Sequence, residues 1–129
     1  MQRIVPMLPY ADAPAAIAFL CRAFGFEERF RMDMPDGTIG HAELALGDDV
    51  VMLASVWREG GLTSPLELHA LHAQIWCRVD DVDAHFARAR AAGATLVGAP
   101  EDQAHGGRSY RALDLEGHRW IFSGPARGR

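Results

Sequence analysis

Two stretches decide the fold: VPMLPYAD at residues 5–12 and QIWCRVDD at residues 74–81. Each is a short, mostly apolar run that ends in aspartate, and each opens a stretch whose apolar residues recur at helical spacing. The terminal aspartates, Asp12 and Asp81, are 69 residues apart (81 minus 12). Self-similarity at one offset predicts a fold built from two copies of one unit.

The helical stretches after the two aspartates are bounded in the same way. We expect helices over residues 13–24 and 82–92, each with aspartate at its N-cap. A glycine follows the last turn of each helix, Gly25 in the first half and Gly93 in the second. The apolar spacing predicts that each helix buries one face.

Three β-type segments follow each helix, separated by turns rich in Gly, Pro and Asp. The expected strands cover residues 26–32, 39–46 and 50–56 in the first half and 95–97, 109–113 and 118–122 in the second. One half alone buries too little surface to be stable. We therefore predict an α+β fold in which two βαβββ modules form a curved mixed sheet around a cavity, with the helices outside.

The chain is expected to form a single domain over residues 1–129. Module one spans about residues 1–58, and a Gly- and Pro-containing linker spans about residues 59–71. Module two follows over about residues 72–124, and a short tail covers 125–129.

Composition excludes several classes of function. The formal net charge of -4 argues against a nucleic-acid partner, which needs a basic surface. All 13 basic residues are Arg, so Schiff-base chemistry on lysine is excluded. No stretch approaches the roughly 20 apolar residues that cross a bilayer, so no membrane partner is expected. The two cysteines, Cys21 and Cys77, are too few for a disulfide framework, which favours a reducing, cytoplasmic location.

Several motifs in both halves resemble those of the vicinal oxygen chelate superfamily. They are AAIAFL at 15–20, FGF at 24–26, VDDVDA at 79–84, AAGA at 91–94 and DLEGHRWIF at 114–122. In the last motif, Leu115 stands where the superfamily commonly has proline. The superfamily includes glyoxalase I, extradiol dioxygenases, fosfomycin-resistance enzymes and bleomycin-resistance binding proteins. The resemblance covers nearly the whole chain outside the linker and tail, and it implies the fold while leaving the activity open.

Enzymes of this superfamily typically hold a divalent metal with two to four His, Glu or Gln side chains on the first and last strands of each half. The resemblance and the repeat place these positions at Val5, Met52, Gln74 and Ile121. Three of these side chains are apolar, and the amide of Gln74 is a weak neutral ligand. We therefore predict no metal site and no cofactor.

His41 and Glu43 lie two residues apart on an expected strand, so alternation places both on one face. They are the candidates for catalysis, as an acid–base or hydrogen-bonding pair in the cavity. The alternative is that this is the solvent-facing polar side of a half-buried strand.

The other histidines are weaker candidates. His69 and His72 share a face only if the linker is helical there, where they would form a metal pair or a pocket lid. Otherwise the linker packs its leucines and leaves both histidines in solvent. His85 on the second helix and His105 in a turn are expected at the surface.

The aromatic side chains indicate a ligand that is flat. Trp76 shares a face with Gln74 and is expected to point into the cavity, whereas Trp120 is expected to pack under a helix. Core packing remains the alternative for any one of these aromatics. The candidate ligand-binding residues are Trp76, Trp57, Gln74, Arg78, His41, Met52 and Tyr110.

These observations favour a metal-independent protein that binds a small planar organic ligand, as in the sequestration of a drug or toxin. The alternative is a metal-dependent lyase, isomerase, thiol transferase or dioxygenase of the same superfamily. A purely structural or protein-binding role is a third interpretation. We expect a homodimer, in which the modules pair within one chain or swap between two chains.

Overall fold

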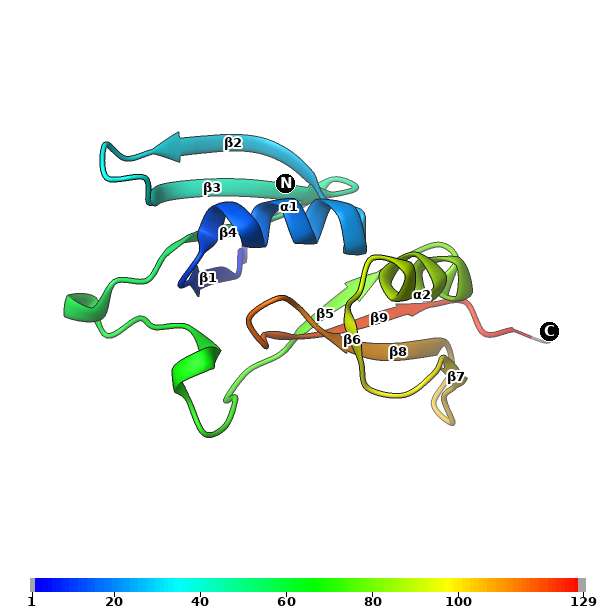
Figure 1. Ribbon diagram of the computed structural model, residues 1–129. Coiled ribbons are helices and arrows are strands. Elements are labelled where there is room, and N and C mark those ends of the chain that lie inside the picture. Colours follow the sequence, from blue (N-terminus) through cyan, green and yellow to red (C-terminus); the bar gives the residue numbers. More distant parts are fainter. Residues whose placement is uncertain (1, 128–129) are drawn as a thin grey trace.

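The computed structural model describes residues 2–127 and contains the predicted repeat of elements (Figure 1). Module one consists of β1 (Met7–Tyr10), α1 (Ala13–Phe24), β2 (Glu27–Asp33), β3 (Ile39–Leu46) and β4 (Asp49–Ser55). Module two consists of β5 (Ile75–Arg78), α2 (Val82–Ala91), β6 (Thr95–Leu96), β7 (Glu101–Asp102), β8 (Arg108–Leu113) and β9 (Arg119–Gly124). Two short 3-10 turns, Arg58–Gly60 and Pro65–Glu67, lie between the modules. The predicted α+β fold is confirmed, with β7 as an additional short strand.

Both helices begin at the predicted caps. The Asp12 carboxylate accepts a hydrogen bond from the backbone N–H of Ala15 at 3.1 Å, and the Asp81 carboxylate accepts one from Ala84 at 3.0 Å. Helix α1 ends at Gly25, whose φ of 81° lies in the left-handed region that favours glycine. Helix α2 ends at Ala91, one residue before the predicted end.

The strands form two mixed sheets of equivalent topology. The first sheet has the order β1-β4-β3-β2, and the second has the order β5-β9-β8-β6, with β7 also paired to β8. In each sheet the first strand runs parallel to the last one: Met7 lies opposite Met52, and Trp76 lies opposite Ile121. Trp76 follows Met7 by 69 residues, and Ile121 follows Met52 by 69 residues. The same offset separates the two capping aspartates.

One hydrophobic core joins the two modules, and α1 lies at its centre. The Phe24 ring packs against Trp120 and Phe122 of β9, with ring centroids 5.9 and 4.8 Å apart. Trp120 is fully buried, so its predicted position under the helices is confirmed. Burial of these large side chains across the module boundary gives the two modules a common core.

In one respect the arrangement differs from the expected one. Helices α1 and α2 contact each other and lie between the two sheets of the chain (Figure 1). The sheets therefore do not close around one cavity within a single chain, and each leaves the face opposite the helices open. The core clusters on the helix-facing sides because α1 is apolar around most of its circumference.

His85 was expected at the surface, but its imidazole contacts residues of both modules. Its Nε2 is 2.8 Å from the carbonyl oxygen of Phe24 in module one, and its Nδ1 is 2.6 Å from the hydroxyl of Tyr110. The prediction was wrong because α2 packs against both α1 and β8, which leaves His85 half-buried.

Neither helix is long and apolar enough to span a membrane, within the part of the chain that the structure describes.

Candidate functional site

The face of the first sheet that points away from the helices, here called the first open face, carries a row of side chains across all four strands. The register places Met7 opposite Met52, Met52 opposite Glu43, and Glu43 opposite Phe30. Residues opposite one another in neighbouring strands share a face, so these side chains are neighbours. Met7 is 69% exposed and Phe30 is 49% exposed, which is unusual for large apolar side chains.

His41 and Glu43 stand together on the first open face, as alternation predicted. The Nε2 atom of His41 is 3.0 Å from Oε2 of Glu43, and both side chains are about one-third exposed, at 29% and 34%. The Phe30 ring lies beside the imidazole, with centroids 5.9 Å apart. The pair can donate or accept hydrogen bonds to a ligand, and it combines a proton carrier with a carboxylate that orients it.

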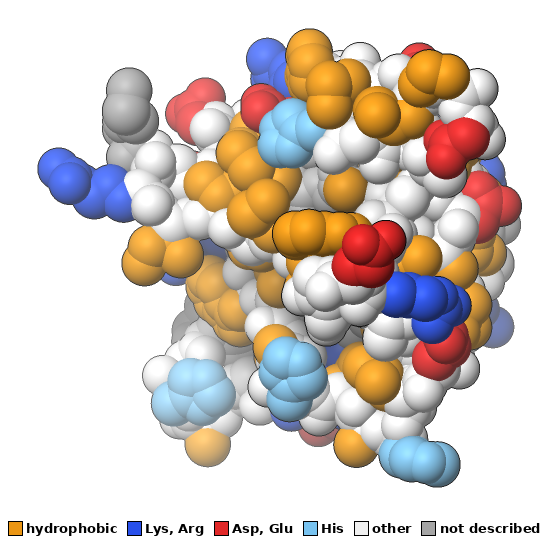
Figure 2. All heavy atoms as spheres, turned by 90° about the vertical axis from the view of Figure 1, so that its left-hand side faces the viewer, with side chains coloured by type: hydrophobic (Ala, Val, Ile, Leu, Met, Phe, Trp, Pro, Cys, Tyr) orange, Lys and Arg blue, Asp and Glu red, His pale blue; other side chains and the backbone are white. Residues whose placement is uncertain are grey.

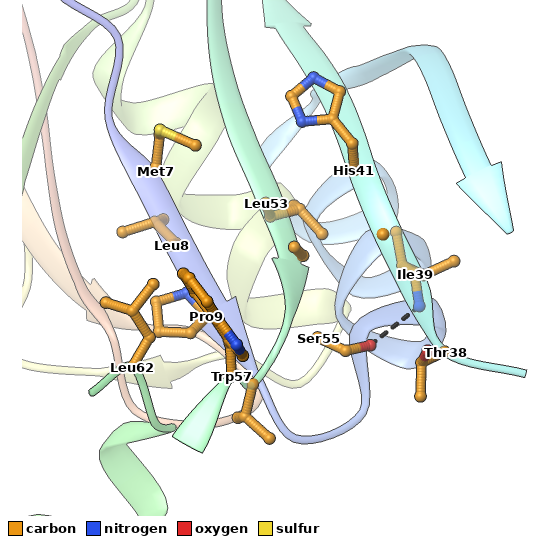
Figure 3. A pocket seen from close by; sticks show the side chains of 13 residues that line it. Met7, Leu8, Pro9, Thr38, Ile39, His41, Leu53, Ser55, Trp57 and Leu62 are labelled. Atoms are coloured by element: carbon orange, nitrogen blue, oxygen red, sulfur yellow. Dashed lines mark hydrogen bonds between the residues drawn. The ribbon is translucent and has the colours of Figure 1, made fainter. Parts of the chain in front are cut away.

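A groove of about 390 Å³ begins beside His41 and runs along β1, β3 and β4. Figure 3 shows His41 and Met7 at one end of the groove, and Trp57, Pro9 and Leu62 gathered at the other. The groove is lined by Met7, Leu8, Pro9, Thr38, Ile39, Gly40, His41, Leu53, Ala54, Ser55, Val56, Trp57 and Leu62. Most of these side chains are apolar, and the Ser55 hydroxyl already accepts a hydrogen bond from the backbone N–H of Ile39 at 2.9 Å.

The surrounding surface is also largely apolar. Figure 2 shows hydrophobic side chains gathered over the side that lies on the left in Figure 1, with histidines among them. Such a patch is typical of a ligand site or an interface.

The second sheet also leaves its face away from the helices uncovered, and we call this the second open face. The register places Trp76 opposite Ile121 and Ile121 opposite Arg111. Trp76 is 54% exposed, and the Arg78 guanidinium lies 5.5 Å from the centre of its ring. This contact holds the indole and the cation together in an arrangement that suits a planar ligand with a charged group.

The predicted ligand-binding residues are not brought together within one chain. Trp57 and His41 line the groove on the first open face, and Met52 lies on the same face beside it. Gln74 lines a depression of about 330 Å³, whereas Trp76 and Arg78 line another of about 350 Å³. The two faces are separate in the chain because the helices stand between the sheets.

Tyr110 does not belong with the other candidates. It is 3% exposed on the helix-covered side of β8, and its hydroxyl is bonded to His85. Burial raises the pKa of Tyr110 well above the usual range of a tyrosine, so its hydroxyl stays neutral in the core. The prediction for Tyr110 was wrong because Arg111, its neighbour in sequence, occupies the open face instead.

Arg111 is the residue that the sequence analysis missed. Alternation from buried Tyr110 and Ala112 places it on the second open face. The signal was available in the sequence, because Tyr110 and Ala112 are apolar and alternate with Arg111, so burial of the first two exposes the third.

The positions that hold a metal in enzymes of this fold do not fit a metal ion here. Val5 and Ile121 have no donor atom, the thioether of Met52 suits only soft ions such as Cu(I), and Gln74 offers one neutral oxygen. Among residues 2–127, no three His, Cys, Asp or Glu side chains converge as a metal site requires. Thiolate chemistry is also unfavourable, since burial raises the pKa of Cys77 to about 12.

Comparison with known proteins shows relatives of this chain. The model of the glyoxalase family, described as the glyoxalase/bleomycin resistance protein/dioxygenase superfamily, matches residues 3–122. An uncharacterized protein of Mycobacterium bovis is 39% identical over 125 residues, which cover 95% of this chain and 82% of that protein. An uncharacterized protein of Mycobacterium tuberculosis has the same identity over 95% of this chain and 74% of its own length.

Solved structures have the same architecture. The crystal structure of TioX from Micromonospora sp. ML1 is 36% identical, with a TM-score of 0.75 and coverage of 99% of both chains. The fosfomycin resistance protein FosX from Listeria monocytogenes is 15% identical, with a TM-score of 0.70 over 98% of this chain and 95% of that one. At that identity, the likeness to FosX concerns the fold alone.

Proposed function

The chain belongs to the glyoxalase/bleomycin resistance protein/dioxygenase superfamily, and from this premise we propose that it binds a small planar organic molecule without a metal ion. A drug or a toxin that the protein sequesters in the cytoplasm is the class of ligand that the family name suggests.

The groove on the first open face is the observation that carries the proposal. Its volume of about 390 Å³ lies within the roughly 300–1,000 Å³ of small-molecule sites. Its apolar lining, with Trp57 at one end and the His41–Glu43 pair near the other, combines area for burial with a few polar groups for orientation. Burying about 200 Å² of apolar ligand surface at roughly 25 cal/mol per Å² gives about 5 kcal/mol before association costs. Stacking and hydrogen bonds must therefore supply much of the affinity.

The proposal includes a homodimer, because one chain leaves its two open faces apart. A second copy can cover the first open face with its own second open face, and the reverse contact follows from twofold symmetry. Each of the two sites then contains Trp57, His41 and Met52 from one copy and Trp76, Gln74 and Arg78 from the other. The swapped pairing of modules brings the candidate residues together as one site.

Thermal-shift and calorimetric screening with flat aromatic compounds, with and without divalent metals, tests the proposal. We expect aromatic compounds to stabilise the metal-free protein. Trp57→Ala and Trp76→Ala should each weaken the binding of a confirmed compound by about tenfold. Leu66→Ala, which removes an exposed apolar side chain from the linker, is the matched control. Stabilisation only in the presence of metal, or equal affinity in all three variants, would contradict it.

A second candidate function rests on the His41–Glu43 hydrogen bond of 3.0 Å. A lyase, isomerase, thiol transferase or dioxygenase needs an acid–base group or a metal ligand at the cavity. The imidazole of His41 and the carboxylate of Glu43 are side chains of both kinds. One metal ion per subunit after dialysis, lost in Glu43→Gln, would favour this function over simple binding.

A further inference from the structure

The second open face contains three arginines, and the strands of its sheet place one carboxylate there, that of Glu101 on β7, which lies opposite Ser109. Strands β5, β8 and β9, which form most of this face, contain no acidic residue. The register places Arg78 two residues from Trp76 on β5, Arg111 opposite Ile121, and Arg119 two residues before Ile121 on β9. The three arginines therefore share the face that carries Ile121 and Trp76, with Arg78 in the depression that Trp76 lines and Arg119 in the one that Gln74 lines.

Several other arginines form ion pairs with carboxylates, although Arg22, Arg88 and Arg90 form none among the described residues. Arg31 binds Glu28 at 3.0 Å, and Arg108, at the far end of β8, binds Asp83 at 3.0 Å and Asp102 at 3.3 Å. None of the three arginines on the second open face forms an ion pair within residues 2–127. In a chain of net charge -4, these three arginines form a local cluster of positive charge on one face.

The side chain of Arg119 supplies independent evidence of an unfilled site. Its Nε atom is buried and has no hydrogen-bond partner in the described part of the chain. Buried donors are normally satisfied, so an orphaned guanidinium N–H indicates a missing acceptor. Arg119 lines the same depression as Gln74 and Met7, which lies between the two open faces.

We infer that the ligand is an organic anion whose planar part stacks on Trp76 and whose carboxylate or phosphate binds Arg78, Arg111 and Arg119. This inference rests on the proposed binding function and specifies its ligand. A guanidinium group binds such oxyanions through two parallel N–H···O bonds, and the adjacent indole accepts a flat ring by stacking. Arg78 is already held against Trp76, so the charge and the stacking surface are presented together.

Three matched probes test the charge requirement: 2-naphthoate, 2-naphthyl phosphate and the neutral 2-naphthamide. Calorimetry on the full-length wild-type protein should show at least one of the anions binding about tenfold or more tightly than the amide, and binding of that anion should weaken as salt is added. Which anion binds more tightly distinguishes a carboxylate ligand from a phosphate ligand.

Three substitutions locate the site. Arg78→Gln and Arg111→Gln should each reduce the affinity for the preferred anion by about tenfold and change the affinity for the amide by less than about twofold. Arg90→Gln is the control, because it removes one exposed arginine from α2, on the side of the sheet away from the open face.

Equal affinity of the amide and both anions would overturn the inference while leaving the proposed binding function in place. Failure of all three probes to bind would overturn both. A weaker dimer in Arg111→Gln with unchanged anion affinity would also overturn the inference, since the arginines would then pair with carboxylates of the second copy.

Discussion

The carboxylate of Asp114 is the most heavily bonded side chain of the molecule's interior. It is 5% exposed, and its Oδ2 accepts hydrogen bonds from the Tyr10 hydroxyl at 2.5 Å and the Trp120 indole N–H at 3.0 Å. Its Oδ1 accepts three backbone N–H groups of the turn that follows. Burial, together with this adjacent negative charge, raises the pKa of Tyr10 well above its ordinary value.

Asp114→Ala is expected to lower the free energy of unfolding by about 3 kcal/mol or more, because it leaves two buried side-chain donors without an acceptor. Urea denaturation followed by circular dichroism measures the change. Asp48→Ala, in the exposed turn between β3 and β4, should stay within about 0.5 kcal/mol of wild type. A loss of less than about 1 kcal/mol in Asp114→Ala would show that water replaces the carboxylate.

His85 links stability to pH. Burial, and secondarily the charge of Arg88, lowers the pKa of the imidazole below its ordinary value. Because the carbonyl of Phe24 only accepts, the neutral ring carries its proton on Nε2 and accepts from Tyr110 at Nδ1. Protonation of Nδ1 disrupts this arrangement.

The stability contributed by neutral His85 is complete above the unfolded pKa of about 6.5 and is lost as the pH falls below it, since the unfolded chain then binds more protons. We expect the free energy of unfolding to decrease between pH 7 and pH 5, with a shallower decrease in His85→Gln. Denaturant titrations at several pH values measure both slopes. His105→Gln, at an exposed position, should keep the wild-type slope. Identical slopes in all three proteins would exclude His85 as the source.

At the scale of elements, the carboxylate of Glu116 in module two forms hydrogen bonds with both module one and the linker. Its carboxylate is 4% exposed and accepts from the backbone N–H groups of Ala11 and Asp12, both at 2.7 Å. It also accepts from the hydroxyl of Ser64, at 2.6 Å. The turn between β8 and β9 thereby fixes where α1 starts and where the linker lies.

Glu116→Gln is expected to lower the free energy of unfolding by about 1–3 kcal/mol. An NH2 group replaces one carboxylate oxygen and cannot accept a hydrogen bond from the backbone N–H that it faces. Amide hydrogen exchange should show lost protection at Ala11 or Asp12, whichever N–H faces the new amide nitrogen. Glu101→Gln, on exposed β7, should change neither stability nor exchange at these amides. Unchanged protection at Ala11 and Asp12 in Glu116→Gln would contradict the assigned role.

At the scale of the whole molecule, the open faces predict association. Met7, Phe30, Trp57 and Trp76 all expose about half or more of their surface, and such patches are typical of interfaces. Phe30→Glu is expected to convert a dimer into a monomer in sedimentation at tens of micromolar, because it replaces an exposed apolar ring with a second carboxylate opposite Glu43. Leu66→Glu introduces the same charge on the linker and should remain dimeric. A wild-type protein that sediments as a monomer would refute the dimer.

Much of the architecture could be predicted from local signals. Asp12 and Gly25 bound α1 through hydrogen bonds and backbone conformations that involve only neighbouring residues. Alternation placed His41 and Glu43 together, and the repeat predicted that Met52 and Trp76 point away from the helices, although toward one enclosed cavity rather than two separate open faces. The candidate site was predicted less well, since Tyr110 was assigned to it but is buried, and Arg111, which lies on the second open face, was not singled out.

The sequence by itself determined the two modules, their helices and strands, and which residues of a strand share a face, because helical and strand periods depend on residues a few positions apart. Only the tertiary structure decided that the helices stand between the sheets, that Tyr110 is buried and His85 half-buried, and that three arginines share an uncovered face. Those outcomes depend on contacts between distant residues, such as the bond between Glu116 and Ala11, which are 105 positions apart. No local pattern encodes such a contact, since its energy is realised only when both modules are folded and packed.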